Sequence, residues 1–219
     1  PYATELAQLS AQFQDYEGYL DGDEVIFPQG YFQVIDSLAH NLAIKTGVII
    51  QKILIEGKHI KIIDQNNMTY LGSKVVVTVP LGMLKQQQIE FNPVLNHSYH
   101  NAIQNMGFGS FNKVFFELDT PLPLNRPSHT HCNSHFYFQD HTWFNIFDLS
   151  QIYQKPIYLM MYGGKQSEWI DHATDDEVWS LIAHRLDNLF NYKIDMPNHL
   201  IITRWGVDPF SYGAFSFPS

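Results

Sequence analysis

Lys113 is the charged residue with the clearest potential for chemistry, because it lies within a run of aromatic and branched side chains at 111–118. That run predicts a β-strand in which Phe111, Lys113 and Phe115 share one face. An ammonium group held among aromatic rings has few routes to water, which is the setting in which lysines acquire catalytic roles. The alternative is a lysine at a strand end whose ammonium group reaches solvent along its own aliphatic stem.

A second candidate set is aromatic. Trp205, Phe210 and Phe215 recur every five residues, which fits neither the helical nor the strand period. Pro209 and Gly213 interrupt this segment, so we expect a loop. Aromatic rings carried on a loop can line a pocket for a cationic amine through cation–π attraction. The alternative is a packed aromatic core, which is the more common fate of such rings.

Histidine and cysteine side chains gather in the segment 121–141, which has no regular pattern. Imidazole and thiolate groups at close spacing can ligate zinc. The alternative interpretation is a polar loop beside a cleft, and no second paired ligand set is present. We therefore do not predict that these histidine and cysteine residues bind a metal ion. They are His129, His131, Cys132, His135 and His141.

The elements that must position Lys113 begin with residues 75–79, four of which are valine. This run predicts a strand buried on both faces, ended by Pro80, which has no N–H to donate. A short helix near 98–106 then precedes the strand 111–118. Gly107 and Gly109 only imitate a dinucleotide-binding motif, since they precede a strand rather than a helix.

The remaining pattern alternates helices and strands. Toward the N-terminus we expect helices at 4–16 and 31–43, the second with Val34, Ile35, Leu38 and Leu42 facing inward, a hairpin of 48–56 with 58–64, and a short strand at 69–71. Further on we expect a hairpin of 135–139 with 142–148, a strand at 156–162, a helix from Thr174 to about 190 with a Thr174–Glu177 capping box, and a strand at 200–204. The fold class predicted is α/β with a mixed sheet.

Composition narrows the class of protein. The chain has 219 residues, of which 45% are hydrophobic and 16% charged, and a net charge of −9 without a basic stripe. These values favour a folded protein that does not bind nucleic acid by itself and has no membrane-spanning segment. A single cysteine excludes an internal disulfide. We expect a soluble protein, with the cytoplasm slightly favoured, and an internal fragment, because the chain begins and ends within patterns.

Three segments together resemble the flavin-containing amine oxidases, in particular polyamine oxidases and lysine-specific histone demethylases. They are TVPLGMLKQQQIEFNP at 78–93, AIQNMGFGSFNKVFFELD at 102–119 and TRWGVDPFSYGAFSF at 203–217. They occur in the family's order and at about its separations, and the resemblance covers residues 16–217. It implies FAD-dependent oxidation of a polyamine-like amine to an imine, with hydride transfer to flavin and formation of peroxide from oxygen.

On the substrate side, the resemblance implies that Lys113 holds a water against the flavin ring. It places Trp205 at the flavin and makes Phe215 one wall of an aromatic pair, at a position where tyrosine is usual in the family. Phe111 is our prediction for the opposite wall, and Phe210 is a further candidate substrate contact.

On the cofactor side, the resemblance implies that Gly30 lets the backbone approach the flavin, and that Ile50, Val79 and Pro80 lie near the adenine end of FAD. The alternative for Gly30 is an ordinary turn glycine with positive φ.

The same resemblance divides the chain into a substrate domain at 1–18 and 110–219 and part of an FAD-binding domain at 19–109. The family's GxGxxG segment is absent from these residues, so we expect this fragment to bind FAD weakly or not at all and to be inactive. Two other functions stay open: a non-catalytic protein that binds a cation in the aromatic cleft, and a related flavin oxidase that acts on a non-amine. The amine used and the oligomeric state are not predicted.

Overall fold

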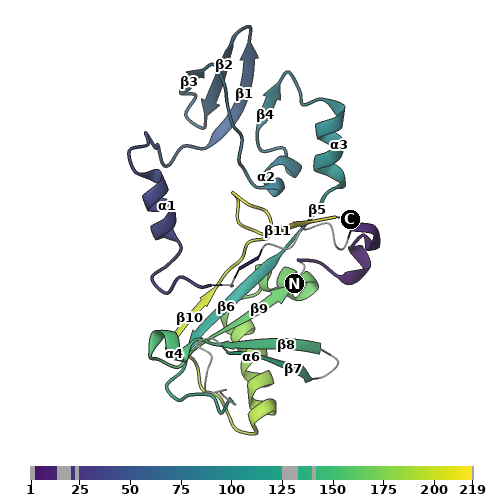
Figure 1. The fold of residues 1–219 in the computed structure, drawn as a ribbon. Coiled ribbons are helices and arrows are strands. Elements are labelled where there is room, and N and C mark those ends of the chain that lie inside the picture. The colour runs from purple at the N-terminus through teal and green to yellow at the C-terminus, as the bar shows by residue number, and fades with distance from the viewer. Residues whose placement is uncertain (1–2, 14–20, 23–24, 125–132, 140–141, 219) are drawn as a thin grey trace. The chain divides into compact units, whose positions relative to one another are not determined.

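The computed structural model describes the chain except residues 1–2, 14–20, 23–24, 125–132, 140–141 and 219 (Figure 1). The chain divides into two compact units. Unit 1 contains Pro1–Ser10 and Gly107–Ser219, and unit 2 contains Ala11–Met106. Both units combine helices with β-sheet, which confirms the predicted mixed α/β fold.

Unit 1 is built on a five-stranded antiparallel sheet in the order β10-β6-β9-β8-β7. Strand β6, which lies between β10 and β9, carries Lys113, and β9 pairs with it over the full length of both strands. The predicted strands and hairpin are confirmed within one to two residues at most ends. Their bounds are β6 Phe111–Glu117, β7 Asn133–Gln139, β8 Thr142–Asp148, β9 Ile157–Gly163 and β10 His199–Ile202.

Two helices, α5 (Gly164–His172) and α6 (Asp175–Phe190), pack against this sheet. Phe116 of β6 is almost fully buried, with its ring centroid 5.4 Å from that of Trp179 on α6 and 5.5 Å from that of Tyr158 on β9. Because side chains alternate along a strand, this contact shows that the even-numbered residues of β6 face the helices. On α6 the side chains of Val178, Ile182 and Leu186 are fully buried and form the face that packs on the sheet.

The core of unit 1 also holds a tyrosine. Tyr162 on β9 is buried, and burial raises the pKa of its phenol to about 12, outweighing the opposite influence of the Arg185 cation. The Arg185 guanidinium lies 5.9 Å from the Tyr162 ring centroid and 5.5 Å from that of Phe144. Arg185 thus packs its charged end on aromatic faces at the margin of the core.

The capping box predicted for α6 is present. The Thr174 hydroxyl accepts from the Glu177 backbone N–H at 3.3 Å, and the Glu177 carboxylate accepts from the Thr174 backbone N–H at 2.8 Å. Hydrogen bonds from Thr174 hold the pKa of Glu177 below its ordinary value of 4.5. The carboxylate therefore stabilises the fold above that value, and the contribution is lost as the pH falls through the lowered folded-state pKa.

Thr174→Ala is expected to lower the free energy of unfolding by about 1 kcal/mol at neutral pH, because it removes the cap. The difference from the unmodified protein should shrink as the pH falls below 4.5, where Glu177 becomes protonated. Thermal unfolding of the complete protein over this pH range measures the effect. Thr174→Ser keeps the hydroxyl and is the matched control. An equal loss in both variants would contradict the capping role.

The N-terminal helix predicted at 4–16 is wrong in its described part. The structure has two 3₁₀ helices instead, η1 (Leu6–Gln8) and η2 (Ala11–Phe13). Between them the backbone N–H of Ser10 donates to the carbonyl of Pro218 at 3.1 Å, so the chain satisfies this donor by a long-range contact rather than by a helical one. Unit 1 further contains α4 (Ser150–Tyr153) and an antiparallel two-stranded sheet of β5 (Gly107–Gly109) with β11 (Phe215–Phe217).

Unit 2 contains a four-stranded sheet in the order β3-β2-β1-β4, in which β1 pairs antiparallel with β2 and parallel with β4. The predicted hairpin, the short strand at 69–71 and the helix near 98–106 are confirmed. The elements are α1 Phe32–Ala39, β1 Ile50–Glu56, β2 His59–Asp64, β3 Thr69–Gly72, α2 Leu81–Lys85, β4 Glu90–Asn92 and α3 His97–Asn105.

Two predictions for unit 2 are wrong. Residues 75–79 form no strand, and Val76 is 83% exposed, because no described strand pairs with this segment. Helix α1 is present but ends at Ala39. Of the residues expected to face inward, Ile35, Leu38 and Leu42 are exposed, with Leu38 at 71%, and Val34 is half-buried. An apolar face is buried only where another element covers it, and the described residues provide no such cover for α1.

No helix in the described part of the chain has the length and apolar character needed to cross a membrane.

Candidate functional site

Lys113 occupies the face of β6 opposite the helices. Its side chain is half-buried, and it shares that face with Phe111 and Phe115. The backbone on either side is held by Thr203, whose hydroxyl accepts from the Lys113 N–H at 2.8 Å and whose N–H donates to the Lys113 carbonyl at 3.0 Å. Lys113 therefore projects from a strand that is paired on both sides, next to the point where the chain leaves β10.

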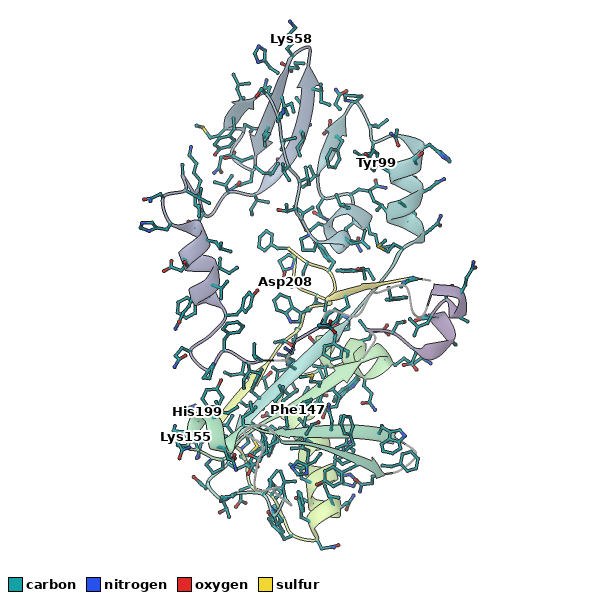
Figure 2. All side chains as sticks on the ribbon, in the orientation of Figure 1. Lys58, Tyr99, Phe147, Lys155, His199 and Asp208 are labelled. Carbon is teal, nitrogen blue, oxygen red and sulfur yellow. The ribbon has the colours of Figure 1, made fainter. Side chains whose placement is uncertain are left out.

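The loop after β10 is organised around Asp208, which is labelled in Figure 2. The Asp208 carbonyl accepts from the N–H groups of Ser211 and Tyr212, and its carboxylate accepts from the Phe210 N–H at 2.9 Å. The loop closes where the N–H of Gly213 donates to the Trp205 carbonyl at 2.8 Å. This confirms that residues 205–214 form a loop and explains why the aromatic spacing follows no regular period.

Gly213 is required at the end of this loop for two reasons. Its φ of +144° lies in a region that residues with a side chain rarely adopt, and a Cβ at this position would lie 2.4 Å from the ring of Phe108. The next residue, Ala214, donates its N–H to the Gly109 carbonyl at 2.8 Å and starts the pairing of β11 with β5. The short sheet therefore fixes where Phe215 leaves the loop.

The predicted aromatic pair consists of rings in direct contact. Phe111 and Phe215 have centroids 5.2 Å apart at 80°, an edge-to-face arrangement that leaves no gap for an amine between them. Phe111 is buried at 6% exposure, whereas Phe215 is 48% exposed. Trp205 and Phe210 are also about half exposed. The surfaces open to a ligand are thus those of Trp205, Phe210 and Phe215, with Phe111 packed beneath Phe215.

Sequence reasoning missed the residue next to Lys113. Asn112 is fully buried and joins β6 to α5 and to the backbone of Trp205 through hydrogen bonds. A polar side chain on the core-facing side of a buried strand was the available signal, since such a group is buried only with partners.

The residues predicted for the cofactor side lie in unit 2. Gly30 has a φ of +96° and donates its N–H to the Phe27 carbonyl at 2.9 Å, which fits the turn alternative without needing a ligand. Ile50 and Val79 are half-buried and Pro80 is exposed. None of the four is enclosed in the core of unit 2, so each remains open to a cofactor.

The suggested zinc ligands mostly lie outside the described residues, namely His129, His131, Cys132 and His141. His135 lies on β7, with its ring centroid 6.5 Å from that of Tyr137 in a stacked arrangement. Within the described ranges, no three histidine, cysteine or acidic side chains are grouped closely enough to hold a metal ion.

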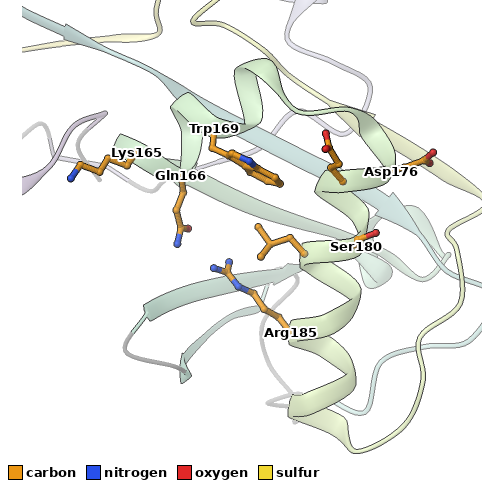
Figure 3. A pocket seen from close by; sticks show the side chains of 8 residues that line it. Lys165, Gln166, Trp169, Asp176, Ser180 and Arg185 are labelled. Carbon is orange, nitrogen blue, oxygen red and sulfur yellow. The ribbon is translucent and has the colours of Figure 1, made fainter.

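A groove of about 570 Å³ lies between α5 and α6 (Figure 3). Cationic and acidic side chains both reach it, and one of the acids, Glu177, is already engaged by Thr174. None of the predicted site residues lines it. The lining residues are Lys165, Gln166, Trp169, Asp176, Glu177, Ser180, Leu181 and Arg185.

Comparison with known proteins identifies the class. The family of flavin containing amine oxidoreductases matches residues 2–219, and the chain belongs to that family. Polyamine oxidase 4 of Oryza sativa subsp. japonica is 26% identical over 98% of this chain and 43% of the relative. Lysine-specific histone demethylase 1 homolog 1 of Arabidopsis thaliana is 28% identical over 98% of this chain and 26% of the relative.

Solved structures agree on the fold. Putrescine oxidase bound to putrescine superposes with a TM-score of 0.64 at 14% identity, over 86% of this chain and 41% of that protein. The chain therefore spans less than half the length of the relatives and structures it matches. The resemblance to flavin-containing amine oxidases is confirmed, and the family implies FAD as the cofactor of the complete protein.

The residues of unit 1 suit a planar aromatic cofactor. The loop exposes the faces of Trp205 and Phe215, and Lys113 supplies a single half-buried cation on the neighbouring strand. Aromatic rings can stack on a flat ring system, and the Lys113 ammonium group can donate hydrogen bonds to acceptor atoms at its edge.

Proposed function

We propose that the complete protein catalyses FAD-dependent oxidation of a small, polyamine-like amine to an imine, with peroxide as the second product. The observation that carries this proposal is a family match over almost the whole chain, together with a half-buried lysine whose strand is bonded to the loop bearing Trp205. Because the relatives named above include a polyamine oxidase and a histone demethylase, the amine itself is part of the proposal.

When bound, FAD supplies the redox chemistry by taking a hydride from the carbon beside the amine nitrogen and passing electrons to oxygen. Lys113 donates hydrogen bonds that hold a water in the site, and water also hydrolyses the imine. Trp205, Phe210 and Phe215 confine the amine through cation–π attraction and exclude bulk water. Phe111 supports Phe215 from within the core, so that ring keeps one orientation.

The two units of the structure support a division of labour. Residues 1–18 and 110–219 would belong to the substrate-binding domain, and residues 19–109 would contribute to the FAD-binding domain. The units differ from this division at residues 11–18, which fall in unit 2, and at residues 107–109, which fall in unit 1. In that second domain, Gly30, Ile50, Val79 and Pro80 would offer backbone groups to the cofactor. Trp205 would contact both the flavin and the amine.

The complete protein is expected to purify yellow and to produce peroxide when given spermine or spermidine. Absorbance of the purified protein measures bound flavin, and a peroxidase-coupled assay measures turnover. Protein from which FAD has been stripped and then restored is the control for cofactor dependence. A colourless protein that makes no peroxide with either amine would contradict the proposal.

A further inference from the structure

Asn112 makes hydrogen bonds with both ends of its amide. Its Nδ2 donates to Asp171 Oδ1 at 2.8 Å and to the Ser167 carbonyl at 3.1 Å, both on α5. Its Oδ1 accepts from the Trp205 backbone N–H at 3.0 Å and from the Thr203 hydroxyl at 3.2 Å. The side chain is fully buried, so water cannot replace any of these partners.

Asp171 braces this arrangement from the helix. Its Oδ1 accepts from the Gly206 backbone N–H at 3.0 Å as well as from Asn112. A Cβ at Gly206 would lie 2.0 Å from Asp171 Oδ2, so only glycine allows this close approach. Two successive backbone N–H groups, those of Trp205 and Gly206, are therefore held by two buried side chains.

The same bonds reach Lys113 through Thr203. The Thr203 hydroxyl accepts from the Lys113 N–H and donates to Asn112 Oδ1. A continuous chain of hydrogen bonds thus runs from the Lys113 backbone through Thr203 and Asn112 to the Trp205 backbone. It joins positions that are more than 90 residues apart in sequence.

We propose that Asn112, braced by Asp171, is a positioning residue that fixes Trp205 relative to Lys113. An amide suits this position because it donates toward the carboxylate of α5 and accepts from the loop at the same time. The consequence for the amine substrate rests on the proposed function, whereas the placement of Trp205 can be measured without it.

Fluorine NMR of the complete protein, labelled with fluorotryptophan, tests the placement directly. Trp205→Phe and Trp179→Phe assign the two resonances needed, one at the loop and one in the core. In Asn112→Ala the Trp205 resonance is expected to shift or broaden, while that of Trp179 stays unchanged. Asn145→Ala is the matched control, because Asn145 lies on β8 of the same sheet and its amide oxygen accepts from the Met161 N–H of β9 rather than from a backbone N–H of the loop.

A second substitution that rescues the first distinguishes a role of Asn112 in positioning Trp205 from a general loss of stability. Asn112→Asp sets a second carboxylate against Asp171 and is expected to move the Trp205 resonance as Asn112→Ala does. Adding Asp171→Asn removes one charge and restores a donor between the two positions, so the double variant should return the resonance toward its original place. The double variant also carries the test if Asn112→Ala does not fold.

The outcomes are distinct. A Trp205 resonance that stays in place in the folded Asn112 variants would overturn the proposal, as would equal changes at Trp205 and Trp179. In turnover assays, Asn112→Asp is expected to raise KM for the amine about tenfold, with a smaller change in kcat and recovery in the double variant. If the unmodified protein oxidises no amine, the proposed function fails while the NMR result still decides the role of Asn112.

Discussion

Replacing Lys113 by methionine is expected to slow amine oxidation by about 10²-fold or more, because one preorganised hydrogen-bond donor at a reacting centre commonly contributes that much. Methionine preserves the length and apolar stem of the side chain, so packing beside Phe111 and Phe115 should be kept. The ammonium group is the only part removed. Rapid-mixing absorbance measurements follow reduction of the flavin by the amine and its reoxidation by oxygen as separate steps.

Lys165→Met is the matched control, since Lys165 is an exposed lysine in the groove between α5 and α6. It should leave both steps unchanged. The thermal midpoint of the Lys113 variant should stay close to that of the unmodified protein. Equal activity of the two variants would remove Lys113 from the mechanism.

Phe116→Ala is expected to lower the free energy of unfolding by about 3–5 kcal/mol, which is the usual cost of deleting a buried phenyl ring. Phe116 is 1% exposed and contacts both Tyr158 and Trp179, so the cavity left behind lies between β6, β9 and α6. Chemical denaturation of the complete protein, followed by the fluorescence of its tryptophans, measures the change.

Phe136→Ala makes the same chemical change at a ring that is 67% exposed on β7 of the same sheet. Its cost should stay below about 1 kcal/mol because little apolar area returns to water. Similar losses in the two variants would show that the core of unit 1 does not depend on Phe116.

Local sequence patterns correctly predicted the elements whose apolar side chains are covered by other elements of the same unit. Strand β6 was predicted from its aromatic and branched residues, and α6 was predicted with its capping box. In both, the pattern is matched by cover within unit 1, where Val114 and Ile182 are completely buried. In these two elements the residues that the sequence pattern makes apolar are the residues that the fold buries, so the pattern predicts the structure.

The two wrong predictions for unit 2 concern segments whose apolar side chains are not covered by the described residues. The valines at 75–79 and the apolar residues of α1 carry strong patterns, yet Val76 and Leu38 are exposed. A pattern states which face an element would bury, but it does not supply the neighbour. Hydrophobic periodicity alone therefore predicted α1 as a helix and failed on its burial.

The sequence suggested which residues belong to the candidate site, but it did not predict the hydrogen bonds and strand pairing that hold them. Lys113 and the aromatic loop residues were visible from the sequence because their types and spacing are unusual. The bond from Asn112 to Asp171 spans 59 positions, and the pairing of β5 with β11 joins segments that are still farther apart in sequence. Contacts at such separations leave no local period in a single sequence, so only the folded chain reveals them.

Burial of Tyr162 bears on how the pH dependence of turnover should be interpreted. Its raised pKa of about 12 keeps the phenol protonated across the alkaline range in which an amine substrate loses its proton. Tyr162 then adds neither phenolate absorbance nor a charge change to an alkaline titration in that range. An alkaline limb in the rate profile would accordingly reflect ionisation of the substrate or of groups nearer the solvent.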